Sequence, residues 1–190
     1  MDMKKLIAAA ALLACVGGAS AQVYVGGALG ATNQDVDCQG ASKCDKNAVG
    51  GKLYAGYAID PVFALEAGYA NFGKFSASGN VSGVGLVSVD LRSSAVFILG
   101  AIRGTVAPDM KLVGRLGMAN VTSKIDVSMP SASGSDSMSE ISAYYGIGLE
   151  YTINKNLSAS VEADFTKAAD VAETGNGLIR MISVGAQYRF

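Results

Sequence analysis

The sequence contains no histidine, three cysteines and three prolines, and only 16% of its 190 residues are charged. Histidine is the usual side chain for proton transfer near neutral pH, so its absence argues against an enzyme. Zinc sites are built mainly from histidine and cysteine, and this sequence has too few of both. We therefore expect no catalytic residue, no metal site and no cofactor.

The sequence also lacks a long apolar run after Val16 and an excess of either charge. No later stretch approaches the roughly 20 apolar residues that a membrane-spanning helix needs. Without Asp2, Lys4 and Lys5 of the leader described next, the 15 basic residues fall to 13 and the 16 acidic residues to 15, a net charge of −2. This balance gives no footprint for nucleic acid, so no nucleic-acid partner is expected.

Residues 1–21 have the organisation of a signal peptide. Lys4 and Lys5 precede the apolar run Leu6–Val16, and small residues follow up to a cleavage point before Gln22. The run is too short to span a bilayer as a helix. An alternative is lipidation at Cys15, because Leu12–Cys15 loosely matches a lipoprotein processing site. We expect export, cleavage after Ala21 and one mature domain over 22–190.

The clearest pattern that is present is a period of two along the last thirteen residues, Leu178–Phe190. From Ile182 onward every second residue is apolar or aromatic, and the residues between are small or polar. This alternation predicts a β-strand with one apolar face. Such a strand, ending on an aromatic residue, is typical of one that closes a lipid-embedded barrel.

Eight segments of the mature chain alternate in this way, near 22–32, 50–60, 62–74, 88–106, 110–122, 139–153, 157–167 and 178–190. Very short connections alternate with longer polar ones, which we place at about 33–49, 75–87, 123–138 and 168–177. This pattern predicts an all-β fold, an eight-stranded antiparallel up-and-down transmembrane β-barrel with short periplasmic turns and long outer loops. The Ser- and Gly-rich loop 123–138 is expected to be mobile.

The composition of the two faces favours lipid over water outside the barrel. In 139–153 the row Ile141, Ala143, Tyr145, Ile147, Leu149, Tyr151 and Ile153 opposes Ser142, Tyr144, Gly146, Gly148, Glu150 and Thr152. Small residues with sparse charges suit a narrow interior, where an isolated charge is costly. A soluble barrel with an apolar cavity is the alternative, but it requires a charged exterior. The segment 95–102 is apolar on both faces, so the directions of Arg92 and Arg103 stay open and a bulge is an option.

Several motifs resemble the transmembrane domain of OmpA and the related opacity-type outer-membrane proteins across the mature chain. They are Tyr24–Gly30, Tyr54–Tyr57 with Phe63–Tyr69, Arg115–Gly117, Gly148–Tyr151 and Tyr188–Phe190. The resemblance implies an eight-stranded barrel in the outer membrane of a Gram-negative bacterium. Because the sequence ends at Phe190, we expect no peptidoglycan-binding domain of the OmpA kind.

The resemblance also implies a charge network inside the barrel. Family positions for interior carboxylates and their basic partners match Glu66, Arg115, Glu150 and Glu162, whereas one basic position is Ser160 here. The basic partners must then come from Arg115, Lys111 or Lys52, and Asp164 lies in the same row as Glu162. An eight-stranded barrel is just wide enough for side chains to fill, so these charges are expected to plug the lumen and leave no significant open pore.

Cys38 and Cys44 lie close together in the first long loop, and Cys15 leaves with the leader. In an oxidising compartment such a pair predicts a disulfide. The alternative is two free thiols or a metal site.

Two functions fit these expectations. The first is a non-enzymatic barrel that stabilises the envelope and presents loops for adhesion or binding of host factors, since exposed loops on a rigid scaffold are common binding sites. Its expected partners are outer-membrane lipid and lipopolysaccharide, host or surface ligands, and the assembly machinery, which would read Tyr188 and Phe190 as a C-terminal signal. The second is a small channel or transporter for ions or small solutes.

Overall fold

The computed structural model describes residues 23–35, 43–81, 85–130, 132–169 and 177–190. These residues form nine antiparallel strands: β1 (Val23–Gln34), β2 (Lys43–Asp45), β3 (Asn47–Ala58), β4 (Phe63–Val81), β5 (Gly85–Ala107), β6 (Met110–Met129), β7 (Ala132–Thr152), β8 (Leu157–Lys167) and β9 (Leu178–Arg189). No helix in the described part of the chain has the length and hydropathy to cross a bilayer.

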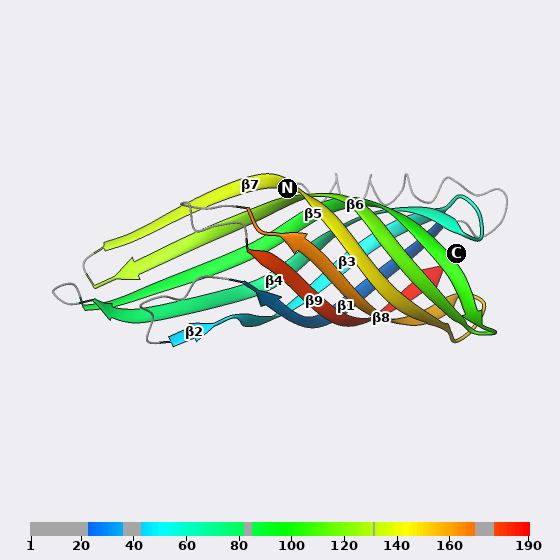
Figure 1. The fold of residues 1–190 in the computed structure, drawn as a ribbon, viewed down its shortest axis with the longest axis horizontal. Helices are drawn as coiled ribbons and strands as arrows, with labels where there is room; N and C mark the ends of the chain where they lie inside the picture. Colours follow the sequence, from blue (N-terminus) through cyan, green and yellow to red (C-terminus); the bar gives the residue numbers. More distant parts are fainter. Residues whose placement is uncertain (1–22, 36–42, 82–84, 131, 170–176) are drawn as a thin grey trace, which may run out of the picture.

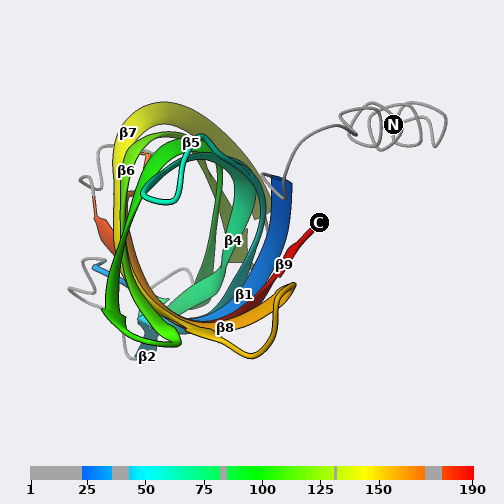
Figure 2. The same ribbon diagram turned by 90° about the vertical axis from the view of Figure 1, so that its right-hand side faces the viewer.

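Eight of the strands close into a barrel in the order β1-β3-β4-β5-β6-β7-β8-β9, and β9 returns to pair with β1. The view along the barrel shows this ring (Figure 2). Each strand is hydrogen-bonded to its neighbour in the sequence, β2 apart, and short turns join β3 to β4, β5 to β6 and β7 to β8. The predicted eight-stranded up-and-down barrel is confirmed.

Two of the predicted loops are wrong. Residues 75–87 and 123–138 were expected to be loops, but most of them belong to strands, because β4, β5, β6 and β7 continue their pairing out to Val81, Gly85, Met129 and Ala132. Most of the Ser-rich segment therefore belongs to the paired strands β6 and β7 and not to a loop. Its outer part shows no clear alternation in sequence because both faces are open to water.

The continued strands form a four-stranded sheet, which we call the extension. It projects from the side of the barrel opposite the short turns, as the long arrows of β4–β7 in Figure 1 show. Strand β2, which the sequence did not predict, pairs with Ser76–Ser78 at one edge of this sheet. At the other edge, β8 pairs with β7 only from Tyr144 to Thr152. Thr166 of β8 also donates to the Ala143 carbonyl at 3.0 Å. The backbone of Ala132–Ser142 therefore has no strand paired on its outer side among the described residues.

The apolar rows face outward. Leu29, Leu53, Ile98, Leu116 and Ile182 are each about two-thirds exposed or more in the isolated barrel. The charged and small rows face the lumen, which excludes the soluble barrel with an apolar cavity. Strand β5 places Arg103 inside and Arg92 outside.

Two bulges adjust the register around β5. Its pairing with β4 is interrupted by one extra residue of β4 between Asn71 and Lys74, where Gly73 has φ of +84°. Its pairing with β6 shifts between Thr105 and Ala107.

Several predictions fall on residues that lie outside the described ranges. These are the signal peptide 1–21, the lipidation site Cys15, and Cys38 of the expected disulfide. Only the backbone of Cys44 is described, in β2. The disulfide remains a prediction.

Candidate functional site

Seven charged side chains meet inside the barrel and form what we call the lumen charge cluster. All are nearly inaccessible to solvent and come from strands β3 to β8: Lys52, Glu66, Arg103, Arg115, Glu150, Glu162 and Asp164. The alternation of each strand aims these residues inward. Three cations face four carboxylates, a formal charge of −1, and such groups are tolerated in a dry interior only when each has partners.

Arg115 lies at the centre of this cluster. Its Nε donates to Oε2 of Glu66 at 2.7 Å, and its two Nη atoms lie 3.5 Å from Glu150 and 3.3 Å from Glu162. Three carboxylates from three strands are thus tied to one guanidinium. The planar fork of arginine suits this arrangement, because it presents several donors in fixed directions.

Arg103 and Tyr24 extend the cluster toward the short turns. Nη2 of Arg103 donates to the Tyr24 hydroxyl at 2.7 Å and to Glu66 at 3.1 Å, and the Tyr24 hydroxyl donates to Glu66 at 2.7 Å. The Arg103 guanidinium also lies 4.7 Å from the centre of the Tyr24 ring, a cation–π distance. Sequence reasoning missed both residues as members of the cluster.

Lys52 completes the other end. Its Nζ lies 2.5 Å from Glu162 and 2.6 Å from Asp164. Ser160, which stands where the family has a base, donates to Oε1 of Glu162 at 2.7 Å. Lys52 and Arg103 therefore supply the positive charge that Ser160 does not.

The remaining predicted member, Lys111, lies outside the cluster. It is opposite Glu150 in the β6–β7 register, but it is partly exposed near the short turn and forms no ion pair with a described residue. Arg103 takes the place beside Glu150 instead, at 3.6 Å.

An apolar layer fills the lumen on the extension side of the cluster. Going along each strand from its short turn, Phe72 follows Glu66, Phe97 lies beyond Arg103, and Tyr144 lies beyond Glu150. The rings of Phe97 and Tyr144 pack with centroids 5.1 Å apart. The buried layer also includes Phe75, Val121, Ile179 and Met181.

The two layers together fill the middle of the lumen with buried side chains. A hydrated ion on its way through would have to break the lumen charge cluster and then lose its water in an apolar layer, and both steps are costly. The arrangement ties the strands together across the lumen and can hold them in register.

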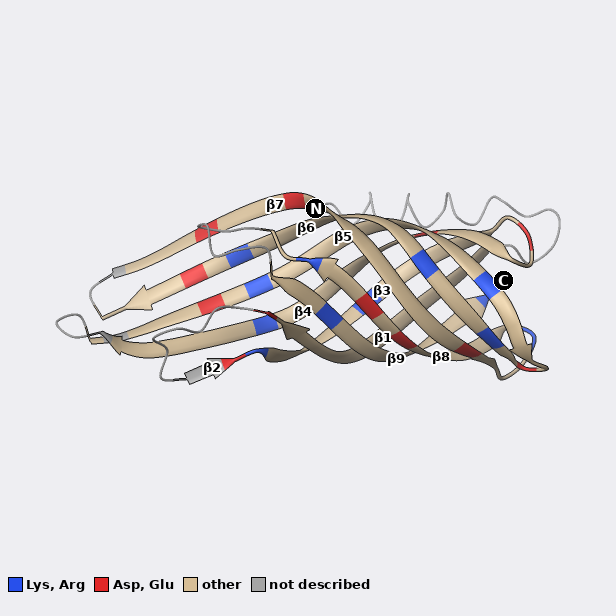
Figure 3. Cartoon of the chain, viewed as in Figure 1, with Lys and Arg blue, Asp and Glu red and all other residues tan. Residues whose placement is uncertain are grey.

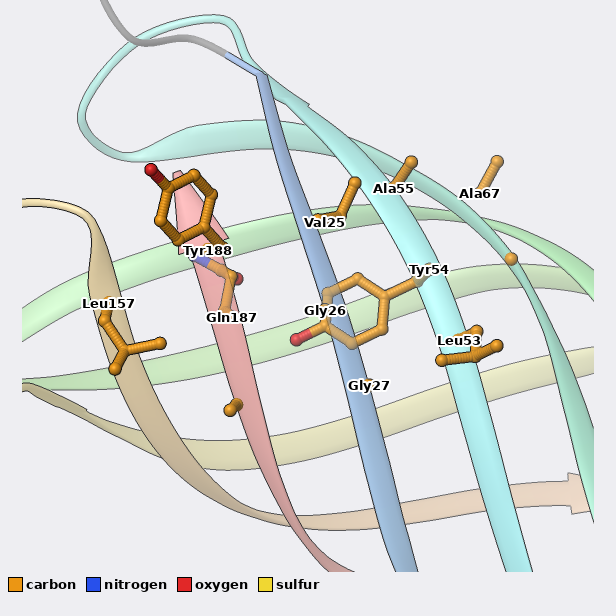
Figure 4. A pocket seen from close by; sticks show the side chains of 12 residues that line it. Val25, Gly26, Gly27, Leu53, Tyr54, Ala55, Ala67, Leu157, Gln187 and Tyr188 are labelled. Atoms are coloured by element: carbon orange, nitrogen blue, oxygen red, sulfur yellow. The ribbon is translucent and has the colours of Figure 1, made fainter. Parts of the chain in front are cut away.

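The outer wall also has an apolar hollow that extends over β8, β9, β1, β3 and β4 (Figure 4). Gly27, which has no side chain, lies at the bottom of the hollow. The side chains of Val25, Leu53, Leu157 and Tyr188 surround it. These surrounding side chains belong to the outward apolar rows. In a bilayer, acyl chains fill such a hollow.

Comparison with known proteins agrees with this architecture. Residues 18–190 match the model of the OmpA-like transmembrane domain family. An uncharacterised protein of Haemophilus influenzae is 28% identical over 176 residues, which cover 91% of this chain and 95% of that protein.

Two crystal structures share the fold. Ail, the attachment invasion locus protein of Yersinia pestis, is 21% identical with a TM-score of 0.57, covering 89% of this chain and 99% of that one. Neisserial surface protein A is 12% identical with a TM-score of 0.64, covering 88% and 97%.

Proposed function

Since the chain belongs to the OmpA-like transmembrane domain family, we propose that it is a non-enzymatic surface protein whose extension binds partners outside the cell. The protein is an eight-stranded barrel of the Gram-negative outer membrane. Barrels of this kind have short periplasmic turns and longer outer segments, which directs the extension outward. The barrel also serves as a stable element of the envelope.

The observation that carries the proposal is the free edge of β7. From Ser133 to Ile141 every side chain is exposed, and the backbone on the outer side has no strand beside it within the described residues. A free edge presents unpaired N–H and C=O groups that can add a strand of another protein. The opposite edge of the extension is covered by β2, so the proposal assigns partner binding to the β7 side.

Ail, whose name refers to attachment and invasion, is one protein that has the same fold. Ail of Yersinia pestis has been crystallised with the heparin analogue sucrose octasulfate. That ligand belongs to Ail, and the identity of 20% supports only the shared fold. For this chain, we propose adhesion or host-factor binding as the general class of interaction.

The filled lumen argues against the second candidate, a small channel. Conduction would need a continuous water-filled path, whereas the lumen charge cluster and the apolar layer occupy the bore one above the other. We therefore propose that the wild-type barrel does not conduct.

The test compares two truncations in cells that display the protein. In the first, residues 125–136 at the β6–β7 end are replaced by Asn-Gly, which leaves the paired residues Lys124 and Ser137 beside the new turn. In the matched control, residues 77–89 at the β4–β5 end are replaced in the same way, which leaves the pair Ser76 and Asp90. We expect the first to reduce adhesion to epithelial cells and the control to retain most of it. Equal adhesion of wild type and the first variant, or stable large channels of wild type in planar bilayers, would contradict the proposal.

Two smaller proposals accompany it. We propose that Tyr188 and Phe190, whose rings are in edge contact at 5.2 Å, are read by the assembly machinery. Replacing Phe190 by Ala should then slow insertion in cells more than it changes stability of the refolded barrel. We also propose a Cys38–Cys44 disulfide, which thiol labelling with and without reductant tests; labelling without reductant would refute it.

A further inference from the structure

We propose that three cations on the outward face of the extension form a binding site for the phosphate groups of glycolipid headgroups in the outer leaflet. The site, which we call the basic row, consists of Lys74 on β4, Arg92 on β5 and Lys124 on β6. Lys74 is directly opposite Arg92 in the register, and Arg92 is directly opposite Lys124. In Figure 3, where Lys and Arg are blue, the neighbouring strands β4, β5 and β6 each carry a blue segment in the extension.

The register brings the three charges close together. Paired residues of adjacent strands point to the same face, and strands lie about 4.8 Å apart, so the row spans roughly 10 Å. All three side chains are exposed. Like charges directly opposite each other destabilise a sheet. An anion bound across the row removes this repulsion.

A bulge in β4 builds the row. If the register of Asn71 and Ser94 continued without a bulge, Lys74 would be opposite Leu91 and point to the inner face. The bulge uses Gly73 at φ +84°, and Oδ1 of Asn71 accepts a hydrogen bond from the Gly73 N–H at 2.8 Å. Bulges commonly re-aim a side chain in this way.

The height of the row on the barrel identifies the ligand. Tyr69, Val96 and Ile141 end the lipid-facing apolar band on their strands. One outward row farther from the membrane lie Asn71, Ser94, Thr122 and Ser139, and the basic row follows next. Two residues of a strand span about 6.6 Å, so the basic row lies about 13 Å along the strands from Tyr69. Strands of such barrels tilt by about 35–45°, so this is roughly 10 Å along the membrane normal, at the outer margin of the headgroup region.

The charges around the row favour an anion held in the membrane over one from solution. The next row outward is acidic, with Asp90 opposite Asp126, and it faces the water beyond the membrane. Lys74 pairs with Asp90 at 2.8 Å and Lys124 with Asp126 at 3.3 Å. Arg92, the middle cation, has no ion-pair partner among the described residues, so its guanidinium is available to hold a phosphate with two hydrogen bonds.

The test measures binding of bisphosphorylated lipid A to the complete mature barrel in nanodiscs of zwitterionic lipid, with native mass spectrometry as the readout. Arg92→Gln should weaken binding by about tenfold or more, since a hydrogen-bonded charge pair is lost. Arg92→Lys should restore part of it. Lys155→Gln, which makes the same charge change in a short turn at the other end of the barrel, should have no effect. Heat-modified gel mobility verifies that every variant is folded.

Further arms of the experiment separate the possible sources of the anion. Lipid A without phosphates should bind wild type and Arg92→Gln equally weakly, and millimolar inorganic phosphate should not displace the phosphorylated lipid. Equal affinity of wild type and the Lys74→Gln/Arg92→Gln/Lys124→Gln variant overturns the proposal. Displacement of the phosphorylated lipid by free phosphate also overturns it. The same holds if these substitutions weaken binding of a sulfated polysaccharide such as heparin but leave lipid A binding unchanged. Partner binding through the β7 edge is measured separately, so either proposal can fail alone.

Discussion

Two ion pairs of similar chemistry lie in opposite surroundings in this protein. Arg115 and Glu66 meet at 2.7 Å in the lumen, where each side chain is 1% exposed. Lys74 and Asp90 meet at 2.8 Å on the extension, where the side chains are 47% and 32% exposed. Distance alone does not distinguish them. Burial distinguishes them. Loss of one partner of the buried Arg115–Glu66 pair is costly, so that pair maintains the barrel. The exposed Lys74–Asp90 pair contributes little stability, so Lys74 remains available for a ligand.

The largest expected effect comes from removing the central cation of the lumen. Arg115→Met leaves Glu66, Glu150 and Glu162 without their shared partner, and breaking a buried pair in this way typically costs about 3–5 kcal/mol. The measurement is reversible denaturant unfolding in lipid vesicles, followed by circular dichroism. Lys111→Met on the same strand is the control, and we expect it to change the free energy of unfolding by less than about 0.5 kcal/mol.

A second substitution compares the inner and outer faces of one strand. Phe97→Ala opens a cavity in the apolar layer and should cost about 3 kcal/mol or more. Val96→Ala, the next residue toward the lipid, should cost little, because acyl chains replace the lost contacts. The same denaturant measurement checks both. Equal losses at the two positions would show that the apolar layer is not packed as described.

The bulge of β4 gives an intermediate effect. Gly73→Ala places a Cβ 2.5 Å from the Val49 carbonyl oxygen at a positive φ, so we expect a loss of about 1–2 kcal/mol. Gly104→Ala is the control, because a Cβ there meets no atom within 4 Å. If both substitutions have the same effect on unfolding, the bulge is not under the constraint that the structure gives it.

The smallest expected effect belongs to Asp90. Hydrogen bonds from Lys74 and Ser76 hold the pKa of this carboxyl below its usual value. Since the folded pKa is the lower one, its stabilisation is present above the unfolded pKa and is lost as the pH falls through the folded pKa. Asp90→Asn should remove this acid-side dependence and cost at most about 0.5 kcal/mol at neutral pH, less in high salt. If wild type were still more stable than Asp90→Asn at pH 2, where the carboxyl is protonated, the expected direction of the pH dependence would be contradicted.

The number and order of the barrel strands, and the facing of all but β5, were predictable because a lipid-exposed strand must alternate between apolar and small residues. The facing of β5 stayed open, because residues 95–102 are apolar on both faces. The extension was not predictable, because strands with water on both faces need no such alternation, and Ser133–Ser139 reads like a loop. The polar composition of residues 123–138 led to the prediction of a loop, whereas most of them are in β6 and β7. The backbone pairing with β6 determines the outcome there, and pairing partners are not visible in one strand's sequence.

The lumen charge cluster was predictable in its carboxylates and in Arg115, but not in all its cations. Arg103 follows a segment that is apolar on both faces, so the alternation before it does not show which way it points. Counting back from the turn fails as well, because the bulge between Thr105 and Ala107 reverses the inward and outward positions. Lys52 and Lys111 were equal candidates in sequence. Only the tertiary arrangement places Lys52 against Glu162 and leaves Lys111 near the rim.

The seam between β1 and β9 has a consequence for biogenesis. The first and last strands of the ring pair from Tyr24–Arg189 to Gln34–Ile179, and the Phe190 N–H donates to the Val23 carbonyl at 3.1 Å. Until β9 has left the ribosome, β1 has no partner on that side, and its unpaired peptide groups cannot enter hydrocarbon at acceptable cost. The ring therefore cannot be sealed within a bilayer until the last strand of the chain is complete.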